Sequence, residues 1–390
     1  MIRTYKCRVK LSSAGHERLG EIFSMSAELY NAGLESRIDC YKKTGEGRSL
    51  YDQYKELVQV RADLPEYEAV SSIVFRGVLS RLDKAYKRFF KHGGFPRWKR
   101  WRRWRTIEIN DQCWRMLKKQ GGKLVLKIKG LPRIEVKPSR ELPPKALLKA
   151  IRITRKPLRT EVCLSYDLPT PETKPVTNPV GIDMGISKRL TLSDGETVEK
   201  REIDRKKLIR LQRSVSRKKK GSNNRRKAVS LLAKEWQRLT DKERDCLHRL
   251  TSEIARMYDF IAVEKLKTKN MLRNKHLARS ISEQAWGKFI TLLNEKAESA
   301  GVKMTEVDPG GTSQECSSCG ATVKKDLSVR THKCDCGYEA DRDVNAAINI
   351  LHRGLASIAG GNVTRMVGRM REKQADVGPV RPRTVYGCVN

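Results

Sequence analysis

The amino-acid sequence predicts an α+β protein that is divided into several domains. Some stretches have apolar residues at helical spacing, whereas other short runs alternate apolar and polar residues as β-strands do. Of the 390 residues, 38% are hydrophobic, which is enough to bury roughly two or three separate cores. The segment 168–179 contains four prolines, a composition typical of a boundary between domains.

The first half of the chain combines strands with helices. Residues 1–10 alternate like a strand, and residues 15–90 repeat apolar side chains at helical spacing. Residues 107–168 contain short alternating runs broken by glycine and proline, the pattern of a small barrel or sandwich. We expect the first strand to join this barrel, so that the helices form an insertion within it.

The second half of the chain alternates strands and helices around a cysteine-containing segment. We predict a strand–turn–strand at residues 179–198, a basic helical region at about 204–257 and a buried strand at 260–266. A helix at 282–300, the cysteine segment at 312–340 and a short helix at 343–354 follow. Asp194-Gly195 is the turn signal of the first of these. The last twenty or so residues mix Gly, Pro and Arg, and we expect them to be loose.

The charge of the chain indicates its class of partner. Lys and Arg number 82 against 45 Asp and Glu, a formal net charge of +37. A polyanion is needed to neutralise such a chain, and nucleic acid does so through phosphate contacts and counterion release. A generic solvated basic surface is the alternative, which the clustering of basic with aromatic residues disfavours. No membrane span and no secretory signal are expected, so we predict a cytoplasmic protein.

Four cysteines have the spacing of a metal site. They lie within 21 residues as C-x2-C…C-x-C, and each pair is followed by a glycine that permits a tight turn: Cys316, Cys319, Cys334 and Cys336. Four thiolates form a closed tetrahedral Zn²⁺ site with no position for water, so we predict one structural zinc. Chance proximity of reduced cysteines is the alternative. His332 is a spare candidate ligand, although we expect a solvated histidine there. The six other cysteines are scattered and are expected to be thiols.

Three acidic residues occur in apolar surroundings, where a charge is costly unless it is compensated. Asp183 lies in the strand VGIDMGI, Glu264 ends the strand FIAVE, and Asp343 begins the helix DVNAAINIL. Taken singly, Asp343 is equally well a helix N-cap and Glu264 a surface residue at a strand end. Together, three such carboxylates would suit Mg²⁺ or Mn²⁺, and two ions could activate a water for phosphodiester hydrolysis.

Two basic segments are candidate nucleic-acid contacts. Residues 87–105 contain nine Lys or Arg and no acid, with three tryptophans that can stack on bases unless they belong to a core. Residues 200–230 carry fourteen Lys or Arg against two acids, which is either a solvated helix face or a contact with nucleic acid. The candidates are Arg97, Trp98, Arg100, Trp101, Arg103, Trp104, Lys218, Lys219, Lys220, Arg225, Arg226 and Lys227.

Several motifs resemble the transposon-associated TnpB family, small relatives of type V CRISPR effectors. The similar pieces are GIDMGISKRLTLSDG, IAVEKLKTKNM and CSSCG…RTHKCDCGYEADRDVNAAINIL, and more weakly FPRWKRW and MIRTYK. The resemblance implies that Asp183, Glu264 and Asp343 are the catalytic carboxylates of a RuvC-type nuclease, with Asp341 as a supporting residue or cap. Because all three positions are acidic, it disfavours the family's nuclease-dead members.

The same resemblance implies a domain organisation. It implies a RuvC core like that of RNase H with an inserted zinc ribbon, preceded by a β-barrel wedge domain that carries a helical recognition insert. The implied parts are a wedge (1–10 and 91–170), a recognition insert (11–90), a linker (171–178), a RuvC domain (179–311 and 341–360), a zinc ribbon (312–340) and a flexible tail (361–390).

The function implied by the resemblance is RNA-guided cleavage of DNA. A guide RNA encoded near the gene would pair with one strand of double-stranded DNA, and the protein would read a short motif beside the target. Two rivals are a regulator that binds with a guide but does not cut, and a transposon accessory protein that binds DNA without RNA.

Overall fold

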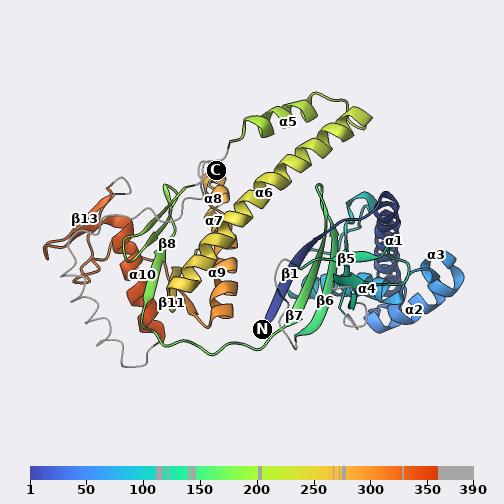
Figure 1. The fold of residues 1–390 in the computed structure, drawn as a ribbon, viewed down its shortest axis with the longest axis horizontal. Helices are drawn as coiled ribbons and strands as arrows, with labels where there is room; N and C mark the ends of the chain where they lie inside the picture. Colours follow the sequence, from blue (N-terminus) through green and yellow to red (C-terminus); the bar gives the residue numbers. More distant parts are fainter. Residues whose placement is uncertain are drawn as a thin grey trace. The chain divides into compact units, whose positions relative to one another are not determined.

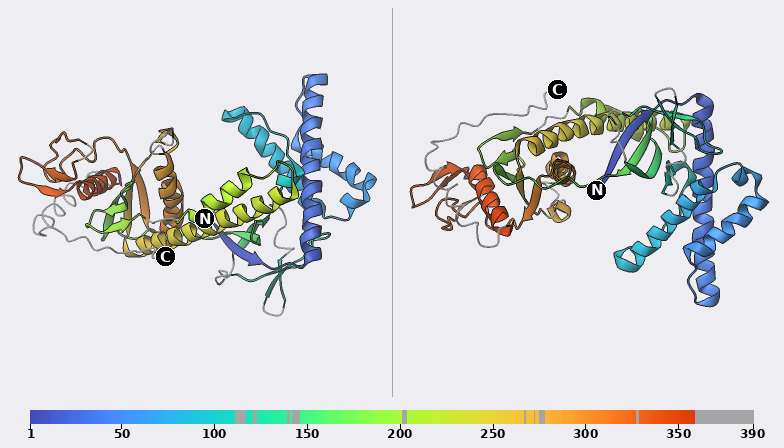
Figure 2. Two further views of the ribbon diagram at one scale, coloured as in Figure 1. Left: turned by 90° about the horizontal axis from the view of Figure 1, so that it is seen from above. Right: turned by 60° about the horizontal axis from the view of Figure 1, so that its bottom comes forward.

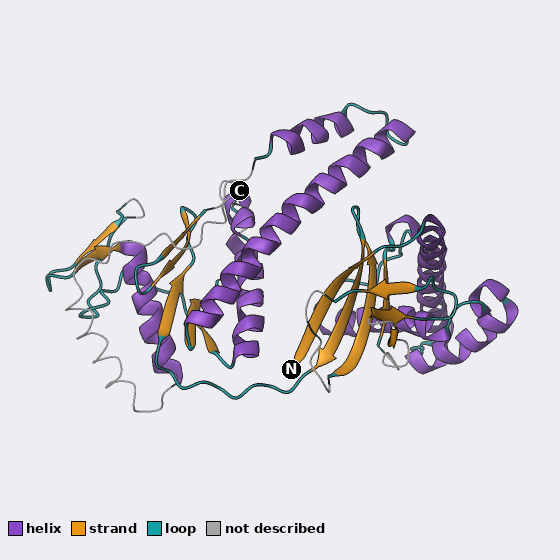
Figure 3. Cartoon of the chain, viewed as in Figure 1, coloured by secondary structure: helices purple, strands orange, loops and turns teal. Residues whose placement is uncertain are grey.

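A computed structural model describes residues 1–358 except 111–116, 121–122, 139–140, 142–145, 201–203, 267, 272, 275–277 and 327–328. The expected C-terminal tail therefore lies outside the described residues. The chain forms two compact units, Met1–Pro169 and Thr170–Asn390, which divide within the proline-rich segment (Figures 1 and 3).

The first unit contains two antiparallel sheets. One has the order β1-β7-β6-β2, formed by β1 (Ile2–Val9), β7 (Thr160–Asp167), β6 (Leu147–Arg155) and β2 (Thr106–Ile109). The other is β3-β4-β5, formed by β3 (Leu117–Gln120), β4 (Lys123–Leu126) and β5 (Ile134–Val136). The expected barrel strands are thus arranged as two sheets in the described part of the chain. β1 pairs with β7 although the 150 residues 10–159 lie between their facing ends, Val9 and Thr160.

Helices occupy the sequence between β1 and β2. They are α1 (Ser13–Thr44), α2 (Leu50–Asp63), α3 (Pro65–Glu68) and α4 (Ser72–His92), followed by the short η1 (Trp101–Arg103). The Ser12 side chain caps α1, and Ser49 with Asp52 forms a capping box at α2. Apolar faces of α1 and α4 pack with the sheets into one core, which explains the helical periodicity of this region.

The second unit is built on a five-stranded sheet with the order β10-β9-β8-β11-β12. The strands are β8 (Pro179–Asp183), β9 (Lys188–Leu192), β10 (Thr197–Glu199), β11 (Phe260–Glu264) and β12 (Lys303–Val307). β11 runs parallel to both β8 and β12, whereas β9 is antiparallel to β8. All five residues of β11 are buried, as expected for a central strand covered on both faces.

Helices cover the two faces of this sheet. Ile261 and Val263 of β11 belong to the core formed with α6 (Asn223–Met257) and α9 (Trp286–Ala300). Phe260 and Ala262 belong to the opposite core, formed with α10 (Arg342–Ile358) (Figure 1). Because neighbouring side chains of a strand point to opposite faces, this division fixes the face on which Glu264 lies.

The predicted basic helical region forms two helices joined by a turn. α5 (Lys206–Ser216) and α6 form a hairpin whose turn contains Gly221, with φ of 92°. Most buried residues of α6 lie in its C-terminal half, so the first half and α5 project from the sheet as an arm (Figure 1; further views in Figure 2). The remaining short helices are α7 (Thr268–Met271) and α8 (Ala278–Gln284).

Two further features concern the cysteines and the membrane prediction. Cys7, Cys40 and Cys163 are thiols as expected, but Cys246 on α6 is disulfide-bonded. The expectation for Cys246 was wrong because the spacing of cysteines along the chain does not show whether a given cysteine is paired. Among the described residues, no helix has the length and apolarity required to cross a membrane.

Candidate functional site

Asp183 and Glu264 end two neighbouring parallel strands on the same face of the sheet. Ile182 of β8 pairs with Val263 of β11, so the residues that follow them lie side by side at the carboxyl edge. Ile182 and Val263 both face α6 and α9. Strand alternation therefore turns Asp183 and Glu264 toward α10. The position at the carboxyl ends of parallel strands is a common location for functional residues in α/β sheets.

The close packing of α10 on β8 brings Asp343 to the same edge. A Cβ built on Gly181 would lie only 2.0 Å from the carbonyl oxygen of Ala347, so the helix backbone rests directly on the strand. Asp343 precedes Ala347 by one turn, about 6 Å along the helix. Asp183 lies two residues beyond Gly181, about 7 Å along the strand. The negative charge of Asp343 raises the pKa of Asp183, as expected for carboxylates at the same edge of the sheet.

The helix cap is Asp341 and not Asp343. The Asp341 carboxylate accepts hydrogen bonds from the backbone N–H groups of Asp343, at 2.8 Å, and Val344, at 3.3 Å. Lys188 on β9 holds the other oxygen of Asp341 at 3.3 Å. The N-cap alternative for Asp343 was therefore wrong, since Asp341 satisfies the first N–H groups of α10.

Burial and mutual repulsion make this carboxylate cluster electrostatically costly. Burial raises the pKa of Asp183 from 3.8 to about 8, and the charges of Glu264 and Asp343 act in the same direction. Burial also raises the pKa of Glu264, while the Thr312 hydroxyl and the Arg353 charge oppose that effect. A bound cation would offset both the burial and the repulsion.

Four polar residues that connect β11, α10 and the segment after β12 were not predicted from the sequence. Thr312 donates a hydrogen bond to Glu264 at 2.7 Å. Asn345, Asn349 and Arg353 recur every four residues on one side of α10 and bind the segment between β12 and the first cysteine pair. Polar side chains repeating at helical spacing within the otherwise apolar α10 are the signal that could have found them.

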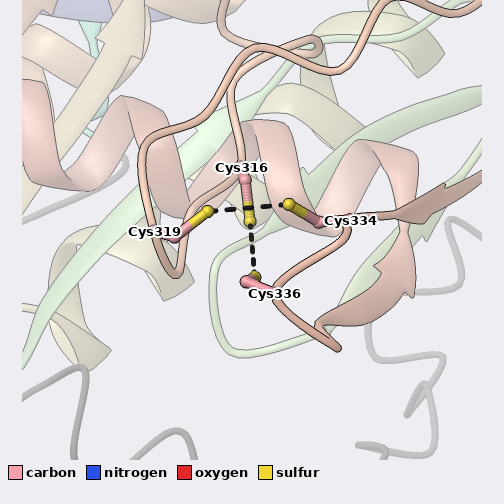
Figure 4. Close-up of side chains that lie close together, drawn as sticks. All are labelled: Cys316, Cys319, Cys334 and Cys336. Carbon is pink, nitrogen blue, oxygen red and sulfur yellow. Dashed lines mark hydrogen bonds between the residues drawn. The ribbon is translucent and has the colours of Figure 1, made fainter.

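The four predicted zinc ligands converge (Figure 4). Their sulfur atoms all lie within 4.8 Å of one another, with Cys316 3.8 Å from Cys336 and Cys319 3.6 Å from Cys334. Sulfurs about 2.3 Å from a tetrahedral zinc are about 3.8 Å apart, so this cluster has the size of a zinc site. Gly320 and Gly337 have φ of 81° and 88°, which confirms that both turns need the left-handed region.

His332 is buried rather than solvated. It lies on β13 (Thr331–Lys333), which pairs with β14 (Glu339–Asp341), and its side chain is inaccessible to solvent. Its Nδ1 contacts Lys325, and it does not belong to the four-cysteine cluster. The expectation was wrong because the imidazole packs beside Tyr338, with ring centroids 6.2 Å apart, and against Lys325. Burial, with the charge of Lys325, lowers its pKa.

The three tryptophans of the first basic segment have different environments. Trp98 and Trp101 are 55% and 54% exposed, whereas Trp104 is only 6% exposed. Trp104 packs on Tyr30, with ring centroids 5.4 Å apart, and the Arg81 guanidinium covers its ring. Trp104 is therefore a core residue, and its assignment as a nucleic-acid contact was wrong. The three neighbouring arginines, Arg97, Arg100 and Arg103, are exposed.

The second basic segment surrounds the turn between α5 and α6. Lys219, Lys220, Arg226 and Lys227 are exposed, and Lys218 is half-buried with its ammonium near Ser214. Arg225 differs from these residues because its guanidinium donates to the carbonyls of Val215 and Lys218, at 2.7 and 3.0 Å. Those bonds satisfy carbonyls at the end of α5 and fix the turn. Arg225 thus has a structural role in the arm.

Two family models match this chain. The model described as "Probable transposase" matches residues 160–275, and the "Cas12f1-like, TNB domain" model matches residues 286–350. The first range contains Asp183 and Glu264, and the second contains the four cysteines and Asp343. Both matched ranges lie mainly in the second unit, which contains the carboxylates and the cysteines.

Relatives extend the similarity over nearly the whole chain. A "Putative RNA-guided DNA endonuclease" of Streptomyces pristinaespiralis is 34% identical over 93% of this chain and 92% of the relative. The "Putative RNA-guided DNA endonuclease InsQ" of Escherichia coli K12 is 30% identical over 77% of this chain and 78% of the relative. TnpB-like proteins of Acanthamoeba polyphaga mimivirus are 29% identical over 46% of this chain.

A solved structure shares the fold. The Cas12f1 chain of a cryo-EM complex of Cas12f1, sgRNA and target DNA has a TM-score of 0.61, with coverage of 90% of this chain and 98% of that one. Its sequence identity is 14%, so this match concerns the fold alone. The long alignments with the Streptomyces and Escherichia relatives establish the membership itself: this chain belongs to the TnpB family of transposon-associated proteins.

Proposed function

We propose that this protein is an RNA-guided DNA endonuclease with an RNase H-like, RuvC-type core. The observation that carries the proposal is the convergence of Asp183, Glu264 and Asp343 from β8, β11 and α10. These carboxylates come from three distant parts of the sequence, and two of them have raised pKa values. Burying three carboxylates close together destabilises the folded protein, and ionisable groups with such perturbed pKa values are typical of functional sites.

The three carboxylates suit Mg²⁺ or Mn²⁺, because hard divalent cations prefer carboxylate oxygens. When bound, such ions supply an activated water and stabilise the leaving oxygen of a phosphodiester. The protein's own residues contribute to this site in three ways. β8 and β11 hold Asp183 and Glu264 side by side, Asp341 fixes the first turn of α10 that carries Asp343, and Thr312 restrains the Glu264 carboxylate.

The four cysteines are proposed to hold one structural Zn²⁺. Their sulfur separations fit four thiolates around one ion, and a site closed by four protein ligands has no place for a reacting water. β14 ends at Asp341, the residue that caps α10. The proposed ribbon therefore supports the start of the helix that carries Asp343.

Guide RNA and double-stranded target DNA are the proposed partners. The net charge of +37 requires a polyanion, and the names of the two long-matching relatives describe RNA-guided DNA endonucleases. Exposed Trp98 and Trp101 beside arginines suit stacking on unpaired bases, and the basic turn of the arm suits phosphate contacts. Base pairing with the guide would supply the sequence specificity that phosphate contacts lack, and the protein would read a short adjacent motif.

The complete carboxylate set favours a nuclease over a regulator that only binds. Replacing Asp183, Glu264 or Asp343 singly by alanine is expected to abolish cleavage while guided binding of the target persists, because binding is spread over many base pairs and phosphates. Cleavage and binding should be measured on the same guide–protein complexes. Asp245→Asn is the matched control, since Asp245 is an exposed carboxylate of α6 that pairs with Arg249, and this variant should retain cleavage. Full activity of Glu264→Ala would refute the assignment.

A further inference from the structure

Glu264 is held by a hydrogen-bond chain that continues into α10. Thr312 Oγ1 donates to Glu264 Oε1 at 2.7 Å, and the exposed fractions of the two residues are only 4% and 7%. The carbonyl oxygen of Thr312 accepts a hydrogen bond from Asn349 Nδ2 at 2.9 Å. Since Asn349 is also buried, the chain from β11 to α10 is shielded from water.

The same side of α10 binds the whole connection from β12 to the first cysteine pair. Asn345 donates to the Glu315 carbonyl at 2.8 Å and accepts from the Ser317 N–H at 3.0 Å. One turn later, Asn349 donates to the Glu315 carbonyl at 2.6 Å. Two turns later, Arg353 donates to the carbonyls of Asp308 and Gly310, at 3.0 and 2.6 Å. We call Asn345, Asn349 and Arg353 the α10 ladder.

We propose that Thr312 is a positioning residue for Glu264 and that the α10 ladder sets the place of Thr312. This inference rests on the proposed role of Glu264 as a metal ligand. A bond to Oε1 restricts rotation of the carboxylate, which pre-orients it for a cation and lowers the entropy lost on binding. Asp343 and the ladder belong to one helix, so the helix that supplies one carboxylate also orients another.

The test measures binding of Mn²⁺ alone to the full-length protein by calorimetry, and the Mg²⁺ dependence of guided cleavage. Thr312→Val keeps the shape but removes the hydroxyl, and should weaken Mn²⁺ binding and raise the Mg²⁺ requirement about tenfold. Thr312→Ser keeps the donor and should restore both. Thr305→Val is the control, because Thr305 on β12 contacts Ser357 and not Glu264. Unchanged zinc content would show that each variant keeps its ribbon.

Asn349→Ala tests the link to the helix. It should also weaken Mn²⁺ binding, and the double variant with Thr312→Val should be little weaker than Thr312→Val alone, because both act through one chain. Fully additive losses would overturn the link, and wild-type Mn²⁺ affinity and Mg²⁺ dependence in Thr312→Val would overturn the positioning role. If Thr312→Val does not fold, Thr312→Ala takes its place, because it also removes the hydroxyl that donates to Glu264. Equal Mn²⁺ affinity of wild type and Asp183→Ala would instead count against the proposed function.

Discussion

Gly181 of β8 lies directly beneath Ala347 of α10, with room for a hydrogen but not for a methyl group. A Cβ at position 181 would lie 2.0 Å from the Ala347 carbonyl oxygen and 2.7 Å from the Leu351 nitrogen. Both of these are backbone atoms, which a rotamer change cannot move. The absence of a side chain at Gly181 therefore allows the helix bearing Asp343 to approach the strand bearing Asp183.

Gly181→Ala is expected to displace α10 and to destabilise the second unit by about 1–3 kcal/mol, the usual cost of overpacking. Cleavage should fall further than stability, because a small shift of Asp343 disrupts the carboxylate cluster. Urea unfolding and cleavage by the guided complex measure the two effects. Gly287→Ala in α9 is the control: its Cβ meets nothing within 4 Å, so stability should be unchanged or slightly higher. Equal stability of the two variants would contradict the packing argument.

The stability of the metal-free protein should depend on Asp183 and pH. Because its folded pKa, about 8, exceeds the ordinary value of 3.8, the folded state binds this proton more tightly than the unfolded state. The resulting stabilisation is present at low pH and is lost between about pH 4 and pH 8. In the presence of a chelator, the wild-type protein should therefore lose stability relative to the Asp183→Asn variant as the pH rises.

The size of this effect is several kcal/mol at most, since one pKa unit corresponds to about 1.4 kcal/mol. Urea unfolding at about pH 5 and about pH 8 measures the difference between the two proteins. Added Mg²⁺ should restore stability to wild type at the higher pH and have a smaller effect on Asp183→Asn, because cations compete with protons for the carboxylates. A difference that does not change with pH would rule out this description of Asp183.

Elemental analysis should find about one zinc per chain after dialysis. Cys319→Ser should reduce the zinc content and increase hydrogen exchange in β13, β14 and the first turn of α10, because the backbone N–H of Arg342 donates to the Arg330 carbonyl of the ribbon. Cys40→Ser is the matched control, since Cys40 is a thiol outside the cluster and should leave the zinc content unchanged. Active wild-type protein without zinc would exclude the ribbon assignment.

Replacing Lys219, Lys220, Arg226 and Lys227 by glutamine should weaken binding of guide RNA and flatten its salt dependence. Each lost phosphate contact lowers the slope of log K against log salt by about 0.7 for single strands and about 0.9 for a duplex, so the total change is at most about 3–4. Arg249→Gln is the control on the same helix, because Asp245 already neutralises Arg249. Arg225 is left unchanged because it fixes the turn. An unaltered slope would show that the guide RNA does not contact these four residues.

The sequence predicted most elements of this fold because their signals are local. Alternation marked β1, β6 and β7, helical spacing marked α1 and α4, and the cysteine spacing predicted the cluster. Local signals were insufficient where burial depends on a distant partner. Trp98, Trp101 and Trp104 have the same sequence context, yet only Trp104 reaches Tyr30 on α1 and is buried.

The sequence by itself determined that Asp183 lies in an apolar strand, that Glu264 ends another and that Asp343 begins a helix. Only the tertiary structure decided that the two strands lie side by side, that Thr312 donates a hydrogen bond to Glu264 and that Asn349 binds the Thr312 carbonyl. The periodicity of apolar residues in the sequence shows which face of each helix or strand is buried. Which of these faces pack against one another depends on close contacts between segments that are far apart in the sequence. That packing is set here by the missing side chain of Gly181.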